Sequence, residues 1–358
     1  MSAVIHPRPN PIVAALYTLR DMDVEVSVIH GPPGCGFMAA RMLELAGMRV
    51  VTSGMSEKDL VFGGMKPLVE TLKTVKERFN PKTVAVVGTC SSMIIGDDVP
   101  AAIRAADIGC NVFHVDCHAC MGDNTRGAVK ALEAGRDAGI ISSEEAHRQK
   151  QLLQAATKME RAVGLTSREY LPPAQGPTKL AVCMRIARCL REGKKVAVVM
   201  LAKKELAYRF ADVLLAVDEA RRELGGSTFM VANLDPERGL PRIRGYAKEI
   251  SEDLVDRGFR IDKVVGGLDE YAVIGEEMRV AVEGFGPDLL ILAGIPHAYP
   301  GMSREDILIT DQPRQLSNYL SSGYSHAVGE ISSHSMVMNV HKIVSTETGD
   351  TLREIAKG

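Results

Sequence analysis

The chain has 358 residues, of which 46% are hydrophobic and 25% are charged, and its formal net charge is −2. A chain of this length is too long to fold around one ordinary hydrophobic core, so we predict two or three soluble domains. The near-zero net charge does not support a nucleic-acid or membrane partner. No stretch reaches the length of a membrane span, and prolines interrupt the opening "MSAVIHPRPNP" where a signal peptide would be apolar, so we expect a cytoplasmic protein.

The first half of the chain alternates short runs of β-branched residues with longer helical patterns. Strands are predicted at 24–29, 48–54, 82–89 and 111–116. Helices are predicted at 66–79, 127–139 and 144–164. Strands separated by helices are typical of βαβ units, so we expect an N-terminal Rossmann-like domain with a parallel sheet over residues 1–170.

A proline-rich linker is predicted at 170–179, "YLPPAQGPTK", and the α/β pattern restarts after it. Strands are predicted at 194–201, 227–234, 259–268 and 287–296, with helices that begin at Lys204, Arg242 and Glu270. These elements predict a second Rossmann-like domain over residues 178–300. The segment 301–358 adds the strand-like runs "EDILIT" and "SHAVGEI" and a terminal helix, "DTLREIAKG"; it either completes a sheet or forms a small third domain.

The seven cysteines are an odd number without the spacing of a secreted disulfide framework, which indicates reduced thiols that are free to bind metal. Four of them follow predicted strands: Cys35, Cys90, Cys117 and Cys120. Open parallel sheets bind ligands beyond the carboxyl ends of their strands, so we expect these thiols to gather in one region. A lone cysteine usually behaves as a small core residue. This is the expectation for the other three: Cys110, Cys183 and Cys189.

The loop "HGPPGCG" at 30–36 surrounds Cys35 with glycines and prolines. Gly34 and Gly36 would let the backbone pass close to a bulky group, and the N–H groups of the helix that follows would favour an anion. The loop lacks the Lys-Ser/Thr pair of a Walker motif and the order of G-x-G-x-x-G. The C-x-x-C at 117–120 fits a redox or zinc site, but no second pair follows at zinc spacing. From the residues alone, a metal site and a set of buried thiols remain equally open.

Two paired motifs, "HGPPGCG" and "GTCSSMIIGDD" at 88–98, closely resemble those of the nitrogenase component 1 superfamily. The stretches "LVFGGMKPL" at 60–68 and "VDCHACMGDNTRGA" at 115–128 are similar to it as well. The resemblance implies Rossmann-like parallel-sheet domains of the nitrogenase component 1 type. It also implies that Cys35 and Cys90 match the family's ligands of an iron–sulfur cluster at a subunit interface.

The chain differs from the nitrogenase subunits at positions that bind metal, and these differences indicate which members of the superfamily it resembles most. No cysteine precedes Cys35, and no residues match the cysteine and histidine that hold the nitrogenase cofactor. The chain is most similar to the short, homodimeric reductive cyclases of methanogens. These members reduce a nickel tetrapyrrole, Ni-sirohydrochlorin a,c-diamide, and close its lactam ring during biosynthesis of the nickel coenzyme of methyl-coenzyme M reductase. The resemblance implies a partner like the nitrogenase iron protein, which binds ATP and magnesium and delivers electrons.

A cubane 4Fe-4S cluster takes four thiolates, so Cys35 and Cys90 would supply half a set. A two-fold axis through the cluster would add the same pair from a second chain, which predicts one shared cluster per homodimer. The rival is a set within one chain, formed by Cys35, Cys90, Cys117 and Cys120. Whether Cys117 or Cys120 touches the cluster stays open at this point.

The resemblance implies a tetrapyrrole substrate, and arginines are expected to bind its carboxylates. The candidates are Arg242, Arg244 and Arg314, and His297 after a predicted strand is a candidate proton donor or metal contact. Three alternative functions remain: a protochlorophyllide-reductase-like enzyme, a nitrogenase-type scaffold for metallocluster assembly, and a dinucleotide-binding module with metal-free cysteines.

Overall fold

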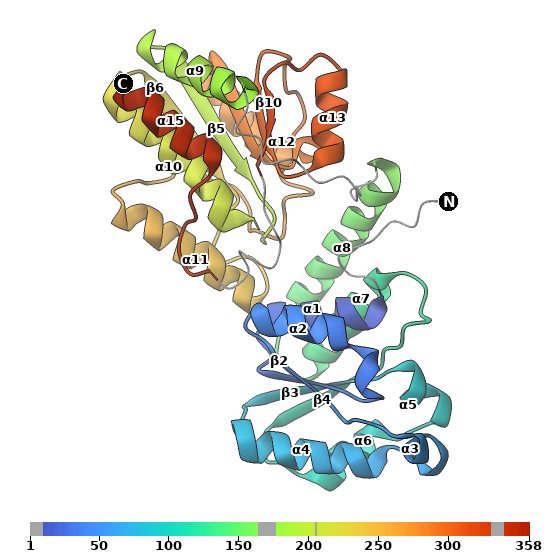
Figure 1. Cartoon of the computed structure of the whole chain (residues 1–358). Helices are drawn as coiled ribbons and strands as arrows, with labels where there is room; N and C mark the ends of the chain where they lie inside the picture. Colours follow the sequence, from blue (N-terminus) through green and yellow to red (C-terminus); the bar gives the residue numbers. More distant parts are fainter. Residues whose placement is uncertain (1–9, 164–176, 205, 331–339) are drawn as a thin grey trace. The chain divides into compact units, whose positions relative to one another are not determined.

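The computed structural model describes residues 10–163, 177–204, 206–330 and 340–358. The chain divides into two compact units (Figure 1). The N-terminal unit extends to Thr157 and also includes Leu240–Arg242, and the C-terminal unit contains Lys158–Gly239 and Ile243–Gly358. No helix in the described ranges is long and apolar enough to cross a membrane.

The N-terminal unit is built on a four-stranded sheet with the order β2-β1-β3-β4. All three pairings are parallel, as predicted from the βαβ pattern. The strands are β1 (Val26–Ile29), β2 (Arg49–Thr52), β3 (Thr83–Val87) and β4 (Asn111–Val115). The strand pair β1 and β3 is central and almost fully buried, which explains its continuous runs of valine and isoleucine.

Helices flank this sheet. They are α1 (Pro11–Asp21), α2 (Phe37–Leu45), α3 (Glu57–Phe62), α4 (Met65–Phe79), α5 (Cys90–Ile95), α6 (Val99–Ala106) and α7 (Asn124–Asp137), with a 3₁₀ turn at Pro33–Cys35. Helix α8 (Ser143–Val163) begins in this unit, and its residues after Thr157 belong to the C-terminal unit. On α4 the buried residues Leu68, Leu72 and Val75 recur at helical spacing and pack with β1, β3 and α6 in one core.

Helix α1 was not predicted from the sequence. Nearly all of its residues are buried, so it has no polar face to produce an amphipathic period. Its start is nevertheless well marked, because the Asn10 side chain accepts a hydrogen bond from the backbone N–H of Val13 and Pro11 follows at the first helical position. Gly127 of α7 allows the close contact between the two helices, since a Cβ there would lie 1.9 Å from the carbonyl oxygen of Pro11.

The C-terminal unit contains a six-stranded parallel sheet with the order β10-β9-β8-β5-β6-β7. Its strands are β5 (Lys195–Leu201), β6 (Ser227–Ala232), β7 (Lys263–Val264), β8 (Leu289–Gly294), β9 (Ile307–Thr310) and β10 (Ala327–Gly329). Its helices are α9 (Pro177–Arg191), α10 (Ala207–Leu224), α11 (Pro241–Asp256), α12 (Gly275–Phe285), α13 (Pro313–Ser321) and α15 (Glu347–Lys357), with a 3₁₀ turn at Pro296–Ala298. The α/β fold class predicted from the sequence is confirmed.

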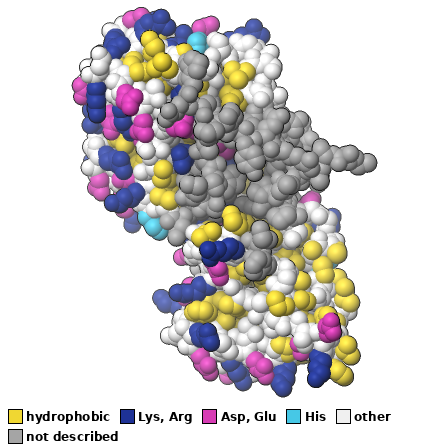
Figure 2. Space-filling view, viewed as in Figure 1, with side chains coloured by type: hydrophobic (Ala, Val, Ile, Leu, Met, Phe, Trp, Pro, Cys, Tyr) yellow, Lys and Arg dark blue, Asp and Glu magenta, His cyan; other side chains and the backbone are white. Residues whose placement is uncertain are grey.

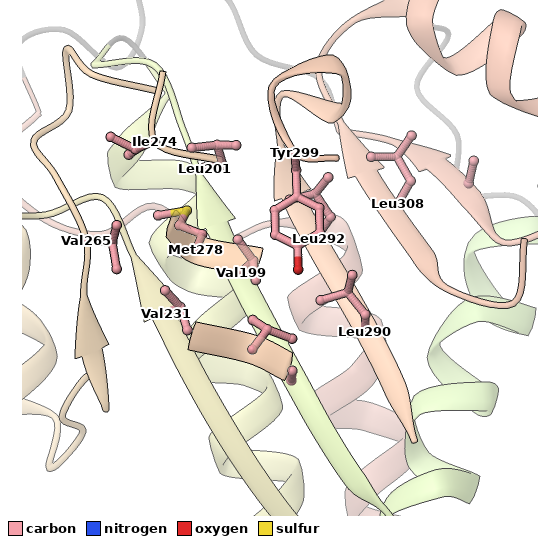
Figure 3. Packing of buried hydrophobic residues seen from close by; sticks show 13 residues of the cluster. Val199, Leu201, Val231, Val265, Ile274, Met278, Leu290, Leu292, Tyr299 and Leu308 are labelled. Atoms are coloured by element: carbon pink, nitrogen blue, oxygen red, sulfur yellow. The ribbon is translucent and has the colours of Figure 1, made fainter. Parts of the chain in front are cut away.

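One core lies between the C-terminal sheet and α12. Figure 3 shows Met278 of α12 among side chains from β5, β6 and β8, including Val199, Val231 and Leu292. On the other side, α10 packs against α9 and α15. In the final segment, 301–358, β9 and β10 extend the sheet beyond β8. Helix α15 of the same segment packs against α9 and α10.

Three local predictions were wrong. Residues 177–179, assigned to the linker, form the first turn of α9, while 170–176 lie outside the described residues. The strand predicted at 259–268 is reduced to the two-residue edge strand β7. The helix predicted from Glu270 begins at Gly275, because the Glu270 carboxylate accepts a hydrogen bond from the backbone N–H of Gly267 in the preceding turn.

Of the three cysteines expected in the core, Cys183 and Cys189 are buried and Cys110 is half-buried at its edge.

Candidate metal centre

Three loops that carry cysteines leave neighbouring strands of the N-terminal sheet. Cys35 follows β1, Cys90 begins α5 directly after β3, and Cys117 and Cys120 follow β4. Since β1, β3 and β4 are adjacent and parallel, their carboxyl ends lie side by side. The Sγ atoms of Cys90 and Cys120 are 3.7 Å apart. Burial raises the pKa of Cys35, and charge on Cys90 raises it further. The structure therefore brings thiols from separate parts of the sequence to one edge of the sheet.

The two motifs of the family resemblance are joined by a buried hydrogen bond between a histidine and an aspartate. His30 Nε2 lies 3.0 Å from Asp97 Oδ2, and its Nδ1 lies 2.9 Å from the Ser53 hydroxyl. The same Asp97 accepts a hydrogen bond from the backbone N–H of Gly64. Burial lowers the pKa of His30 and the neighbouring carboxylate opposes that shift. One aspartate thus fixes the start of the Cys35 loop, the end of α5 and the start of α4.

A second link connects the Cys35 loop directly with Cys90. The hydroxyl of Thr89 donates to the carbonyl oxygen of His30 at 2.8 Å, and a Cβ at Gly31 would lie 2.5 Å from that hydroxyl oxygen. Thr89 also caps α5, whose first residue is Cys90. The position of Cys90 relative to β1 is therefore set by residues on both sides of it.

The glycines beside Cys35 differ in their surroundings. A Cβ at Gly34 would meet no heavy atom within 4 Å among the described residues, so this side of the loop is open. A Cβ at Gly36 would lie 2.3 Å from the Cδ1 atom of Ile29, so this glycine allows the loop to pack on β1. Space for an external group thus lies on the side of Gly34.

The cysteines differ in exposure and acidity. Cys35 and Cys90 are half-buried, Cys120 is exposed, and Cys117 is only 2% exposed. Desolvation raises the pKa of the Cys117 thiol to about 12, which keeps it protonated. Burial, and then charge on Cys90, raise the pKa of Cys35. A thiol with a raised pKa becomes a thiolate when a metal ion replaces its proton, so accessible thiols gathered at this edge suit a thiophilic metal.

His118 is a site residue that the sequence interpretation missed. Ligand atoms of Cys90, His118 and Cys120 all lie within 4.8 Å of one another. The signal that could have identified it is its position inside "CHAC", directly after a strand and between two cysteines.

The arginines proposed for the substrate make contacts within their own chain. The Arg242 guanidinium pairs with Asp23 at 2.7 Å and donates to the carbonyl oxygens of Ala46 and Gly47. Arg244 donates to the carbonyl oxygen of Pro236 and to Glu237. The side chain of Arg314, at the start of α13, lies outside the described residues. Both described guanidinium groups are thus bound by groups of their own chain.

Polar side chains instead collect beyond β8 and β9 of the C-terminal sheet. Burial, followed by the charge of Lys203, lowers the pKa of His297 to about 4. Within the described ranges, the buried atoms His297 Nδ1, both amide atoms of Gln312, and Gln315 Nε2 have no hydrogen-bond partner. Buried polar atoms are normally paired, so this group has unused capacity to bind a polar ligand. Gln312 and Gln315 had no distinguishing motif in the sequence.

Comparisons with known proteins identify the family of the chain. Residues 10–162 match the family described as nitrogenase component 1 type oxidoreductase. The chain is 46% identical to the Ni-sirohydrochlorin a,c-diamide reductive cyclase complex component CfbD of Methanosarcina acetivorans, over 99% of this chain and 98% of that protein. Identity to the components of the same name is 41% in Methanothermobacter thermautotrophicus and 37% in Methanocaldococcus jannaschii, in each case over at least 98% of both chains. The chain therefore belongs to the CfbD family of nitrogenase component 1 type oxidoreductases.

Proposed function

We propose that this protein is the catalytic component of a Ni-sirohydrochlorin a,c-diamide reductive cyclase, an oxidoreductase that reduces the nickel tetrapyrrole and closes its lactam ring. The observation that carries the proposal is identity over nearly the full length of three proteins of that name. The hydrogen bond between His30 and Asp97, which joins the two cysteine motifs, supports a common role for the two loops.

Cys35 and Cys90 are proposed as the protein ligands of an iron–sulfur cluster. Both thiols are half-buried at one edge of the sheet, and the side of the loop at Gly34 is open. Two thiolates are half the set of a 4Fe-4S cubane, which favours a cluster shared between two copies. The burial of Cys117, whose side chain is only 2% exposed, speaks against the set within one chain. When bound, such a cluster supplies single electrons at low potential, and the reduced thiols it requires favour a cytoplasmic location.

The surface beside Cys90 supports a homodimer. The most exposed large apolar side chains of α3 and α5 are Val61 at 75%, Phe62 at 84%, Met93 at 47% and Ile94 at 75%. The two helices pack against each other, and Figure 2 shows hydrophobic side chains gathered over this part of the N-terminal unit. We define these four residues as the apolar patch. Several exposed apolar side chains next to a half-complete ligand set fit a second copy of this chain.

The electron donor is proposed to be an ATPase like the nitrogenase iron protein. The relatives are named as one component of a complex, which implies another component. The loop around Cys35 lacks the residues of a Walker motif, so ATP and magnesium are assigned to the partner.

The polar groups beyond β8 and β9 are proposed to face the substrate. Gln312 offers an amide donor and an amide acceptor, both buried and unpaired within the described ranges, and this combination matches a primary amide of a diamide substrate. His297 is neutral at pH 7 because its pKa is about 4, so its ring can donate or accept one hydrogen bond. A substrate carboxylate nearby would raise that pKa and allow His297 to take up and then release a proton.

The test is an anaerobic assay with the ATPase partner, ATP, magnesium and the nickel substrate, in which the cyclised product is measured by absorbance and mass spectrometry. Product should form only when all components are present, and the Cys35→Ala variant should be inactive. A non-hydrolysable ATP analogue should leave the substrate unchanged. Reduction of protochlorophyllide in place of the nickel compound would overturn the substrate assignment. Transfer of a metallocluster to another protein without turnover would establish the scaffold function instead.

A further inference from the structure

The loop after β4 places two potential metal ligands directly against Cys90. Cys120 Sγ is 3.7 Å from Cys90 Sγ, and a ring nitrogen of His118 lies within 4.8 Å of both sulfurs. His118 also carries a buried Nδ1 that has no hydrogen-bond partner within the described ranges. An unpaired ring nitrogen beside two thiols needs an explanation other than packing, because buried polar atoms are normally satisfied.

The distance between the sulfurs fits one metal ion. Two thiolates bound to a tetrahedral ion, each at about 2.3 Å, lie about 3.8 Å apart. Thiolates that end different irons of a cubane project from separate corners and lie farther apart. Cys90 and Cys120 are therefore spaced as ligands of one ion, and Cys120 is not placed as a further ligand of the shared cluster.

The backbone holds this loop in position. The N–H of Gly88 donates to the carbonyl oxygen of Val115 at 3.1 Å, and a Cβ at Gly88 would lie 2.9 Å from the carbonyl oxygen of Cys117. After Cys120, Arg126 donates to the carbonyl oxygen of Met121 at 3.0 Å. Contacts before and after it thus place the C-x-x-C loop beside Cys90, and the arrangement does not depend on the thiols themselves.

We propose that Cys90, His118 and Cys120 form a binding site for one thiophilic divalent cation, such as Zn²⁺ or Fe²⁺, within a single chain. Three protein ligands leave a fourth position open, and binding releases the two thiol protons. The site itself stands on the geometry of these three residues. Its competition with the cluster for Cys90 rests on the proposed function: a chain that holds the ion cannot also offer Cys90 to a shared cluster.

The test uses the full-length, cluster-free protein under anaerobic conditions, with Co²⁺ as the probe. Wild type should bind one Co²⁺ per chain and show the intense near-ultraviolet absorption of thiolate-to-cobalt charge transfer. Cys35→Ala should bind Co²⁺ equally well, because Cys35 is not part of this site. Cys120→Ala and His118→Ala should each bind at least tenfold more weakly. The matched control is Cys117→Ala, which removes a thiol from the same loop and should bind as wild type does.

Several results would overturn the proposal: loss of the signal in Cys35→Ala, binding of half an ion per chain, or a Cys120→Ala variant with unchanged affinity. Formation of a disulfide between Cys90 and Cys120 in place of metal binding would do the same. Cys120 is exposed, so its substitution should leave the fold intact, and circular dichroism checks this. A separate measurement tests the cluster assignment of the proposed function. If that assignment is wrong, Cys35→Ala should keep its iron after anaerobic cluster reconstitution, and this result does not depend on cobalt binding.

Discussion

Phe62 provides a quantitative test of the proposed dimer. Its side chain is 84% exposed within its own chain, so almost all of it is available for burial against a second copy. Burying a phenylalanine completely is worth up to about 2.5 kcal/mol, and the exposed share of it about 2 kcal/mol. Two-fold symmetry counts the residue twice, so Phe62→Ala should weaken the dimer by about 4 kcal/mol, or about a thousandfold in Kd.

The assay is sedimentation equilibrium of the cluster-free protein, so that a shared cluster does not hold the dimer together. The matched control is Val280→Ala on α12, which removes an exposed apolar side chain that is not part of the apolar patch and should leave Kd unchanged. The free energy of unfolding of the monomer should change little in either variant, because neither side chain is buried in its own chain. An unchanged Kd for Phe62→Ala, with a dimer still present, would refute the assignment of the interface to the apolar patch.

Four further predictions concern single residues. Wild type should carry about two iron atoms per chain, which Cys35→Ala should lose and Cys117→Ala should retain; iron loss in Cys117→Ala would favour the ligand set within one chain. Asp97→Asn should lower the free energy of unfolding by about 1–3 kcal/mol, since it weakens a buried charged hydrogen bond, and urea denaturation measures this. The pKa of His297 is about 4 in the folded chain and 6.5 as its ordinary value, so only the unfolded chain gains a proton between these pH values. The free energy of unfolding should therefore fall as pH drops from 6.5 towards 4, and His297→Gln should flatten this slope; an unaltered slope would contradict the burial argument. Gln312→Leu should unfold with a free energy that is unchanged or about 1 kcal/mol higher, because it removes an unpaired amide, while substrate affinity measured by absorbance titration falls; unchanged affinity would remove Gln312 from the substrate site.

The strands and the main metal-binding motifs could be predicted from the sequence because their signals are local. Runs such as "KTVAVVGT" contain β-branched residues that are buried on both faces of a parallel sheet, and they appear as strands where expected. Cys35 and Cys90 were identified because each follows such a run within a distinctive loop. The hydrogen bond between His30 and Asp97 connects these two loops, which gives a physical reason for the two motifs to occur together.

Other features depend on contacts between residues far apart in the chain. Helix α1 is buried on nearly all sides, so its sequence has no amphipathic period. The sequence predicts a helix that begins at Glu270, but in the structure the Glu270 carboxylate accepts a hydrogen bond from the backbone of the preceding turn. Arg242 looked available for a substrate but pairs with Asp23, which is 219 residues away in the sequence. The approach of His118 and Cys120 to Cys90 likewise follows from the pairing of β3 with β4. Residue type and spacing determine which side chains can bind a metal or a substrate, but only the packing of the sheet decides which of them meet and which are already occupied by the chain itself.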